Sequence, residues 1–84
     1  MDDKSILVRV RSRQGLVFEG VAVAVSSVNA RGPFDVLPDH ANFVSTISKK
    51  LTILKEDGKR EEINVDSGLM QVYHNQVLVF LGII

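Results

Sequence analysis

The chain has 84 residues, of which 45% are hydrophobic and 24% charged, and its formal net charge at pH 7 is zero. This composition is typical of an ordinary globular chain and not of a disordered one. The balance of charges argues against a nucleic-acid binder that relies on phosphate contacts. Because the chain contains no cysteine, a disulfide scaffold and a thiolate metal site are excluded.

The length predicts a single small domain over residues 1–84. At this size, a binding or assembly module is more common than an enzyme with a fully formed cleft. The N-terminus, MDDKSILVRV, begins with acidic residues and lacks the pattern of a signal peptide. The longest uncharged apolar run, at residues 77–84, is far shorter than the ~18 residues of a membrane span. We therefore expect a soluble, cytosolic protein without direct membrane insertion.

The first half of the chain alternates with a period of two residues, which indicates half-buried strands. In residues 5–12, isoleucine and valine fall on one face and arginine on the other. Further short strands are predicted over residues 16–20, 21–28 and 33–37. Gly20 is expected to close the first of these, and turn-forming residues separate the others. A short helical turn after Pro38, capped by Asp39, is a further option.

The second half of the chain predicts two β-hairpins. Residues 49–66 surround Asp57-Gly58, the pair favoured in a two-residue type I′ turn. Residues 67–73 and 76–84 form the second hairpin, with His74-Asn75 at its tip, where asparagine tolerates a positive φ. No segment shows a convincing helical pattern. The predicted fold class is all-β, a small antiparallel β-sandwich or flattened barrel of about eight to ten short strands.

Candidate chemistry concentrates around Asp35, Asp39 and His40. A histidine beside a carboxylate could act as a base and its orienting group. However, Asp39 and His40 are neighbours and point to opposite faces in an extended chain. His74 is expected at an exposed hairpin tip, so the chain does not offer three or four metal ligands at a recognisable spacing. There is no phosphate-binding glycine motif, and no cofactor is predicted. Phe34, in the same stretch, could be a core plug or an exposed contact.

The order of several segments resembles a known family. These are LVRVRS at the start, LVFEGVAVAV, Gly32, LPDHANFVSTI, the Asp-Gly-Lys turn and DSGLMQVYHNQVLVF. The chain resembles the N-terminal β-sandwich domain of the epsilon subunit of F-type ATP synthases, called delta in mitochondria. The Leu-Pro-x-His corner matches Leu37, Pro38 and His40. The late Gly-Leu-x-x-Val segment matches residues 68–72, followed by an asparagine turn at Asn75.

The sequence departs from the family pattern in three respects. Asp35 and Asp39 stand where the family usually has glycine, which places charge and stiffer backbone in a partner-contacting loop. Typical members also continue into a C-terminal helical hairpin, which regulates ATP hydrolysis, whereas this sequence ends at Ile84. It is a natural short form, a remote paralogue or a piece of a longer chain, and regulation by such a hairpin is not expected.

The resemblance implies a non-catalytic rotor subunit of the central stalk. It would bind the gamma subunit and the ring of c subunits on the cytoplasmic side of the inner or plasma membrane, peripheral to the membrane complex. The implied partner interface comprises Asn29, Arg31, Gly32, Pro33, Phe34, Pro38, His40 and Asn42. The residues expected to shape turns are Asp57, Gly58, Gly68 and Asn75. The alternatives are a sandwich repurposed for another partner or ligand, and a small hydrolase or metal site at Asp35, Asp39 and His40.

Overall fold

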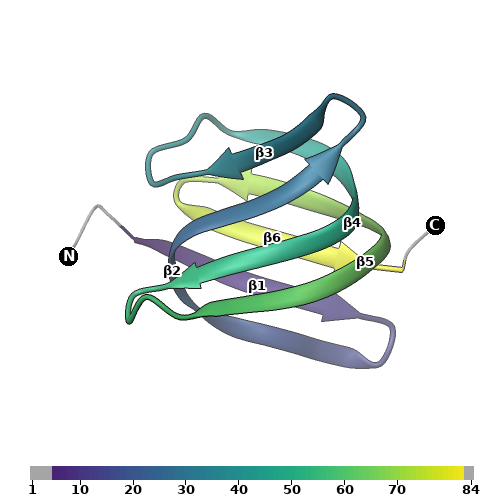
Figure 1. The fold of residues 1–84 in the computed structure, drawn as a ribbon, viewed down its shortest axis with the longest axis horizontal. Coiled ribbons are helices and arrows are strands. Elements are labelled where there is room, and N and C mark those ends of the chain that lie inside the picture. The colour runs from purple at the N-terminus through teal and green to yellow at the C-terminus, as the bar shows by residue number, and fades with distance from the viewer. Residues whose placement is uncertain (1–4, 83–84) are drawn as a thin grey trace.

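A computed structural model describes residues 5–82 and contains six strands in this part of the chain (Figure 1). They are β1 (Ile6–Ser12), β2 (Gly15–Asn29), β3 (Gly32–Val36), β4 (Phe43–Lys55), β5 (Arg60–Tyr73) and β6 (Gln76–Leu81). Loops and turns make up the remainder of residues 5–82, so no helix long and apolar enough to cross a membrane occurs there.

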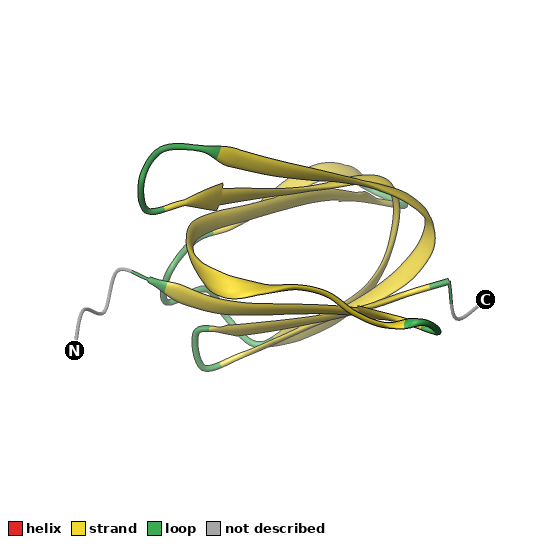
Figure 2. Cartoon of the chain, turned by 90° about the horizontal axis from the view of Figure 1, so that it is seen from below, coloured by secondary structure: helices red, strands yellow, loops and turns green. Residues whose placement is uncertain are grey.

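The strands form one sheet that closes on itself. Their order is β1-β6-β5-β4-β2-β3, and β1 also pairs with β2, so five strands make a closed barrel and β3 lies outside it at an edge. The pairing of β1 with β6 is parallel, whereas the other pairings are antiparallel. Figure 2 shows that the barrel is flattened into two layers, with strands that bend from one layer into the other.

The all-β prediction is confirmed, but six strands replace the predicted eight to ten, and one pairing is parallel. The number is lower because β2, β4 and β5 are 15, 13 and 14 residues long and contribute to both layers. β2 runs through Gly20, where the sequence predicted an end. β5 runs through Gly68, which lies inside the strand and not at a turn. The predicted strand over residues 76–84 ends at Leu81, Gly82 lies in a bend, and residues 83 and 84 lie outside the described part of the chain.

A single hydrophobic core fills the barrel. In β1 the predicted alternation is present, because Ile6, Val8 and Val10 are buried and the residues between them are exposed. Leu51, Ile53 and Met70 are among the largest fully buried side chains. The complete set of buried hydrophobic residues is Ile6, Val8, Val10, Ala22, Val25, Val36, Ile47, Leu51, Ile53, Val65, Met70, Val72, Val77 and Val79.

Two of the predicted turns differ from expectation. Four residues separate β4 from β5, and three of them, residues 56–58, form a loop that is closed by hydrogen bonds from Lys55 N–H to Lys59 O (2.9 Å) and from Gly58 N–H to Lys55 O (3.0 Å). Gly58 has φ +86°, but Asp57 does not have the positive φ that a type I′ turn requires. The suggested helical turn after Pro38 is also wrong. His40 N–H donates to Leu37 O (3.1 Å), which closes a tight turn that does not continue into a helix.

The turn between β5 and β6 follows the sequence prediction. Tyr73 pairs with Gln76, so His74 and Asn75 form a two-residue loop. Both have positive φ, +50° and +61°, which is the signature of a type I′ turn. We refer to His74–Asn75 as the β5–β6 turn.

Candidate docking surface

The predicted interface between Asn29 and Asn42 is not one continuous loop. The turn at Ala30–Arg31 lies at one end of β3, and the loop at Leu37–Asn42 lies at its other end (Figure 1). We refer to Leu37–Asn42 as the β3–β4 loop. The predicted contact residues therefore divide into three groups, at the β2–β3 turn, on edge strand β3 and in the β3–β4 loop.

The β2–β3 turn is held by Asn29. Its Oδ1 accepts a hydrogen bond from Arg31 N–H (2.9 Å), and its Nδ2 donates to Ser45 Oγ on β4 (3.2 Å). Gly32 has φ +114°, where a side chain would strain the backbone, although open space surrounds the position of a Cβ. Asn29 and Gly32 thus shape this turn, while the exposed Arg31 is left available for contact.

Strand β3 presents an edge that is poorly suited to pairing with another strand. Pro33 lies opposite Val28 and is exposed, and it has no N–H to donate to an added strand. Asp35 lies opposite Ser26, whose hydroxyl donates to the Asp35 carboxylate (2.6 Å). A partner is therefore expected to contact β3 through side chains, because the edge offers a poor template for a strand.

A chain of aromatic rings connects β3 to the β3–β4 loop. The rings of Phe34 and Phe43 meet edge to face with centroids 5.9 Å apart, and the His40 ring lies 5.1 Å from that of Phe43. Phe34 and Phe43 are half-buried and pack against the barrel core. Of the two roles that the sequence left open for Phe34, the structure favours core packing. His40 is the exposed member of this group.

The backbone of the β3–β4 loop explains the proline and the position that follows it. Pro38 and Asp39 are the central residues of the turn closed by His40 N–H, and Asp39 has φ +67°. A type II turn needs a positive φ at this third position and favours proline before it. Glycine accepts that conformation at the lowest cost. Asp39 is therefore less favourable for the backbone than glycine, although aspartate tolerates a positive φ, and a contact of its side chain can compensate.

Side chains provide that contact by joining the β3–β4 loop to the β5–β6 turn. Asp39 N–H donates to Asn75 Oδ1 (2.6 Å), and Asn75 Nδ2 donates to Asp39 Oδ1 (3.2 Å). His74 N–H donates to Asn42 Oδ1 (3.0 Å). Sequence reasoning treated the β5–β6 turn as a separate hairpin tip and did not connect it with this loop.

These two segments border a surface hollow of about 290 Å³ that is lined by Asp39, His40, Asn42, His74 and Asn75. The hollow brings both histidines of the chain to one end of the barrel. The His74 ring also contacts the ring of Tyr73 (centroids 4.2 Å apart), which is 53% exposed. His74 and Tyr73 are thus additional candidates for contact that the sequence did not single out.

The structure does not assemble the alternative acid–base site. His40 Nδ1 lies 2.7 Å from Ala41 O, whereas the carboxylates of Asp39 and Asp35 bond to Asn75 and Ser26. No carboxylate therefore orients the imidazole among these contacts. Within residues 5–82, no group of three or more His, Cys, Asp or Glu side chains is arranged to hold a metal ion.

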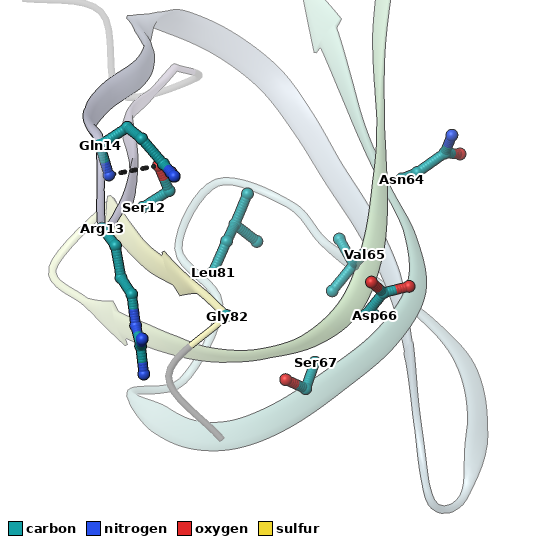
Figure 3. Close-up of a pocket in the computed structure, with 9 residues that line it drawn as sticks. All are labelled: Ser12, Arg13, Gln14, Asn64, Val65, Asp66, Ser67, Leu81 and Gly82. Atoms are coloured by element: carbon teal, nitrogen blue, oxygen red, sulfur yellow. Dashed lines mark hydrogen bonds between the residues drawn. The ribbon is translucent and has the colours of Figure 1, made fainter.

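A second hollow, of about 220 Å³, lies at the other end of the barrel (Figure 3). Its lining comes from the β1–β2 turn, the middle of β5 and the end of β6: Ser12, Arg13, Gln14, Asn64, Val65, Asp66, Ser67, Leu81 and Gly82. None of the predicted contact residues lines this hollow.

Comparison with known proteins assigns the barrel to a family. Residues 5–82 match the family model for the beta-sandwich domain of the ATP synthase delta/epsilon chain. The ATP synthase epsilon chain of a Nitratiruptor species is 34% identical over 64 residues, which cover 75% of this chain and 50% of that protein. The epsilon chain of Campylobacter fetus subsp. fetus is 28% identical over 78 residues, covering 92% and 60% of the two chains.

Solved structures show the same fold at low sequence identity. A chain of the Euglena gracilis mitochondrial ATP synthase, OSCP/F1/c-ring, superposes with a TM-score of 0.86 at 17% identity. The match covers 93% of this chain and 51% of that one. A chain of the Tetrahymena thermophila mitochondrial ATP synthase central stalk/c-ring has a TM-score of 0.72 at 11% identity, covering 90% and 62%. The chain thus spans about half to three-fifths of the length of the relatives that it matches.

Proposed function

Because the chain belongs to the family of ATP synthase delta/epsilon beta-sandwich domains, we propose that it is a non-catalytic central-stalk subunit of an F-type ATP synthase. In this role it binds the gamma subunit and the c-subunit ring and helps to couple ion-driven rotation to ATP synthesis. It is peripheral to the membrane complex, on the cytoplasmic side of the membrane. The observation that carries the proposal is the family match over residues 5–82, which includes all six strands.

The candidate surface supports this proposal through its exposed groups. Arg31 and His40 are exposed, and Leu37 in the β3–β4 loop is 55% exposed although it is apolar. An exposed leucine beside polar groups is a suitable contact for another protein. The acid–base alternative has no comparable support, because the carboxylates of Asp35 and Asp39 are bonded to other side chains.

The proposal is tested by measuring binding of the purified chain to the gamma subunit and to the c-ring from the same organism. Binding at micromolar affinity or better is expected for a specific stalk contact. The double variant Arg31→Ala, His40→Ala should lower this affinity while the melting temperature stays nearly unchanged, because both side chains are exposed.

The matched control is Arg13→Ala, which removes an exposed positive charge from the β1–β2 turn, beside the hollow that none of the predicted contact residues lines. It should leave binding unchanged. If the wild-type chain binds neither the gamma subunit nor the c-ring, the central-stalk role is refuted. If the double variant unfolds at a much lower temperature but binds equally well when folded, the two residues are structural and lie outside the interface.

A further inference from the structure

The β3–β4 loop and the β5–β6 turn lie side by side because β4 pairs with β5 as far as Phe43 and Val72, and beyond this ladder side chains join them. Asn75 uses both ends of its amide, accepting from Asp39 N–H and donating to the Asp39 carboxylate. Asn42 adds a second point of attachment by accepting from His74 N–H. Three hydrogen bonds therefore connect segments that are 32 to 36 residues apart in the sequence.

Apart from these bonds, few contacts hold the loop in one shape: the His40 ring lies against that of Phe43, and His40 Nδ1 lies 2.7 Å from Ala41 O. Five of its six residues, all except Pro38, are exposed, and the loop lies between the last residue of β3 and the first residue of β4. Inside the loop, the hydrogen bond from His40 N–H to Leu37 O closes a single turn. Exposed segments with few packed contacts open at low free energy unless other groups restrain them.

The choice of aspartate at position 39 fits this attachment. Its φ of +67° is tolerated by aspartate, although glycine would adopt it more easily. A glycine, however, would offer no acceptor to Asn75 Nδ2. Aspartate is therefore less favourable than glycine for the backbone at this position, but its carboxylate makes a second hydrogen bond between the loop and the turn.

We propose that Asn75 is a positioning residue, which holds the β3–β4 loop in its binding shape before a partner arrives. This inference rests on the proposed docking role of the loop. A loop that is already ordered loses less conformational entropy on binding, so its affinity is higher than that of a mobile loop with the same contacts. Asn75 thus acts on the partner through Asp39 and the exposed side chains of the loop.

The sharpest test is Asn75→Gly. Position 75 has φ +61° in a type I′ turn, where glycine is favoured, so the hairpin is expected to form normally. The variant removes both bonds to Asp39. Amide exchange at Asp39, followed by NMR in the free protein, should accelerate about fivefold, the factor that corresponds to one net hydrogen bond. Affinity for the gamma subunit or c-ring should fall by a similar factor, with the melting temperature almost unchanged.

A swap of the pair provides a rescue. Asn75→Asp alone sets two carboxylates against each other and should weaken binding. Adding Asp39→Asn restores one amide and one carboxylate in reversed positions, and both residue types tolerate a positive φ. The double variant should regain slow exchange at residue 39 and most of the affinity. Ser12→Ala removes a side-chain contact at the other end of the barrel, with Gln14, and serves as the control.

The outcomes separate the two proposals. If the wild-type chain binds neither partner, the docking role itself fails, whatever the exchange rates are. If it binds and Asn75→Gly binds equally well, the positioning role is overturned and the docking role stands. A loss of affinity without faster exchange at Asp39 also overturns it, because Asn75 would then be a direct contact. Faster exchange, weaker binding and rescue by the swapped pair together establish the positioning role.

Discussion

Replacing Gly68 by alanine should destabilise the barrel although the change adds only one methyl group. Gly68 lies within β5, between Ile47 on β4 and Leu81 on β6. A Cβ at this position would lie 2.9 Å from the backbone oxygen of Phe80 and 3.3 Å from Cγ1 of Ile47. The backbone of β6 cannot move away by changing a rotamer, so the sheet itself must shift.

The magnitude follows from two opposing effects. Adding a methyl group to a well-packed interior costs about 1–3 kcal/mol. Replacing glycine returns roughly 0.4–1 kcal/mol by restricting the unfolded chain. The free energy of unfolding should therefore fall by about 1–2 kcal/mol. In a domain of this size, each 1 kcal/mol shifts the melting temperature by about 4–8 °C, so a decrease of roughly 5–15 °C is expected.

Urea and thermal unfolding followed by circular dichroism measure this change. Gly20→Ala is the matched control, because its Cβ would lie 3.2 Å from Cζ of Phe18, the far end of a side chain that can rotate away. The control should lose less than about 1 kcal/mol. If Gly68→Ala is as stable as the wild type, the reasoning from the backbone contact is incorrect. It is also incorrect if Gly20→Ala lowers the free energy of unfolding more than Gly68→Ala does.

Three further substitutions test other parts of the barrel. Lys49 has φ +71° at the bulge in β4, so Lys49→Gly should raise the free energy of unfolding, measured by urea titration, by about 0.5 kcal/mol. A decrease would show that the lysine side chain stabilises the fold by more than the backbone strain costs. Leu51→Ala leaves a cavity at a fully buried site and should lower the free energy of unfolding, measured by calorimetry, by about 2–5 kcal/mol. A decrease below about 1 kcal/mol would contradict the close packing of the core. The side chains of the Arg9–Glu19 ion pair lie 2.6 Å apart but are 46% and 44% exposed, so Glu19→Gln should lower the free energy of unfolding by less than about 1 kcal/mol, and by still less at high salt. A larger decrease that does not depend on salt would refute this reasoning.

Local patterns in the sequence were sufficient to predict several features of the fold. Alternation in β1 identified its buried face, since a strand turns successive side chains to opposite sides. His74 and Asn75 predicted a two-residue hairpin turn, and both have the positive φ that this turn needs. These predictions succeeded because neighbouring residues determine both properties.

Other features depend on residues that are distant in the chain. Gly20 and Gly68 looked like strand ends, but neighbouring strands continue the ladder through both of them. The parallel pairing of β1 with β6 follows from closure of the whole sheet and has no local signal. In the candidate site, Pro38 and His40 were recognised from their motif. The link from Asp39 to Asn75 was missed because the β5–β6 turn and the β3–β4 loop read as independent segments.

The parallel pair also has a consequence for how the protein folds during synthesis. β1 can pair with β2 as soon as that hairpin has been made, but the other edge of β1 waits for β6. Until then the inner face of β1, with Ile6, Val8 and Val10, lacks part of its cover. Non-local pairings of this kind slow folding, typically to milliseconds or longer in all-β domains. A ribosome-bound chain that stalls before residue 76 would therefore carry an open strand edge and an apolar face, which makes it a substrate for chaperones.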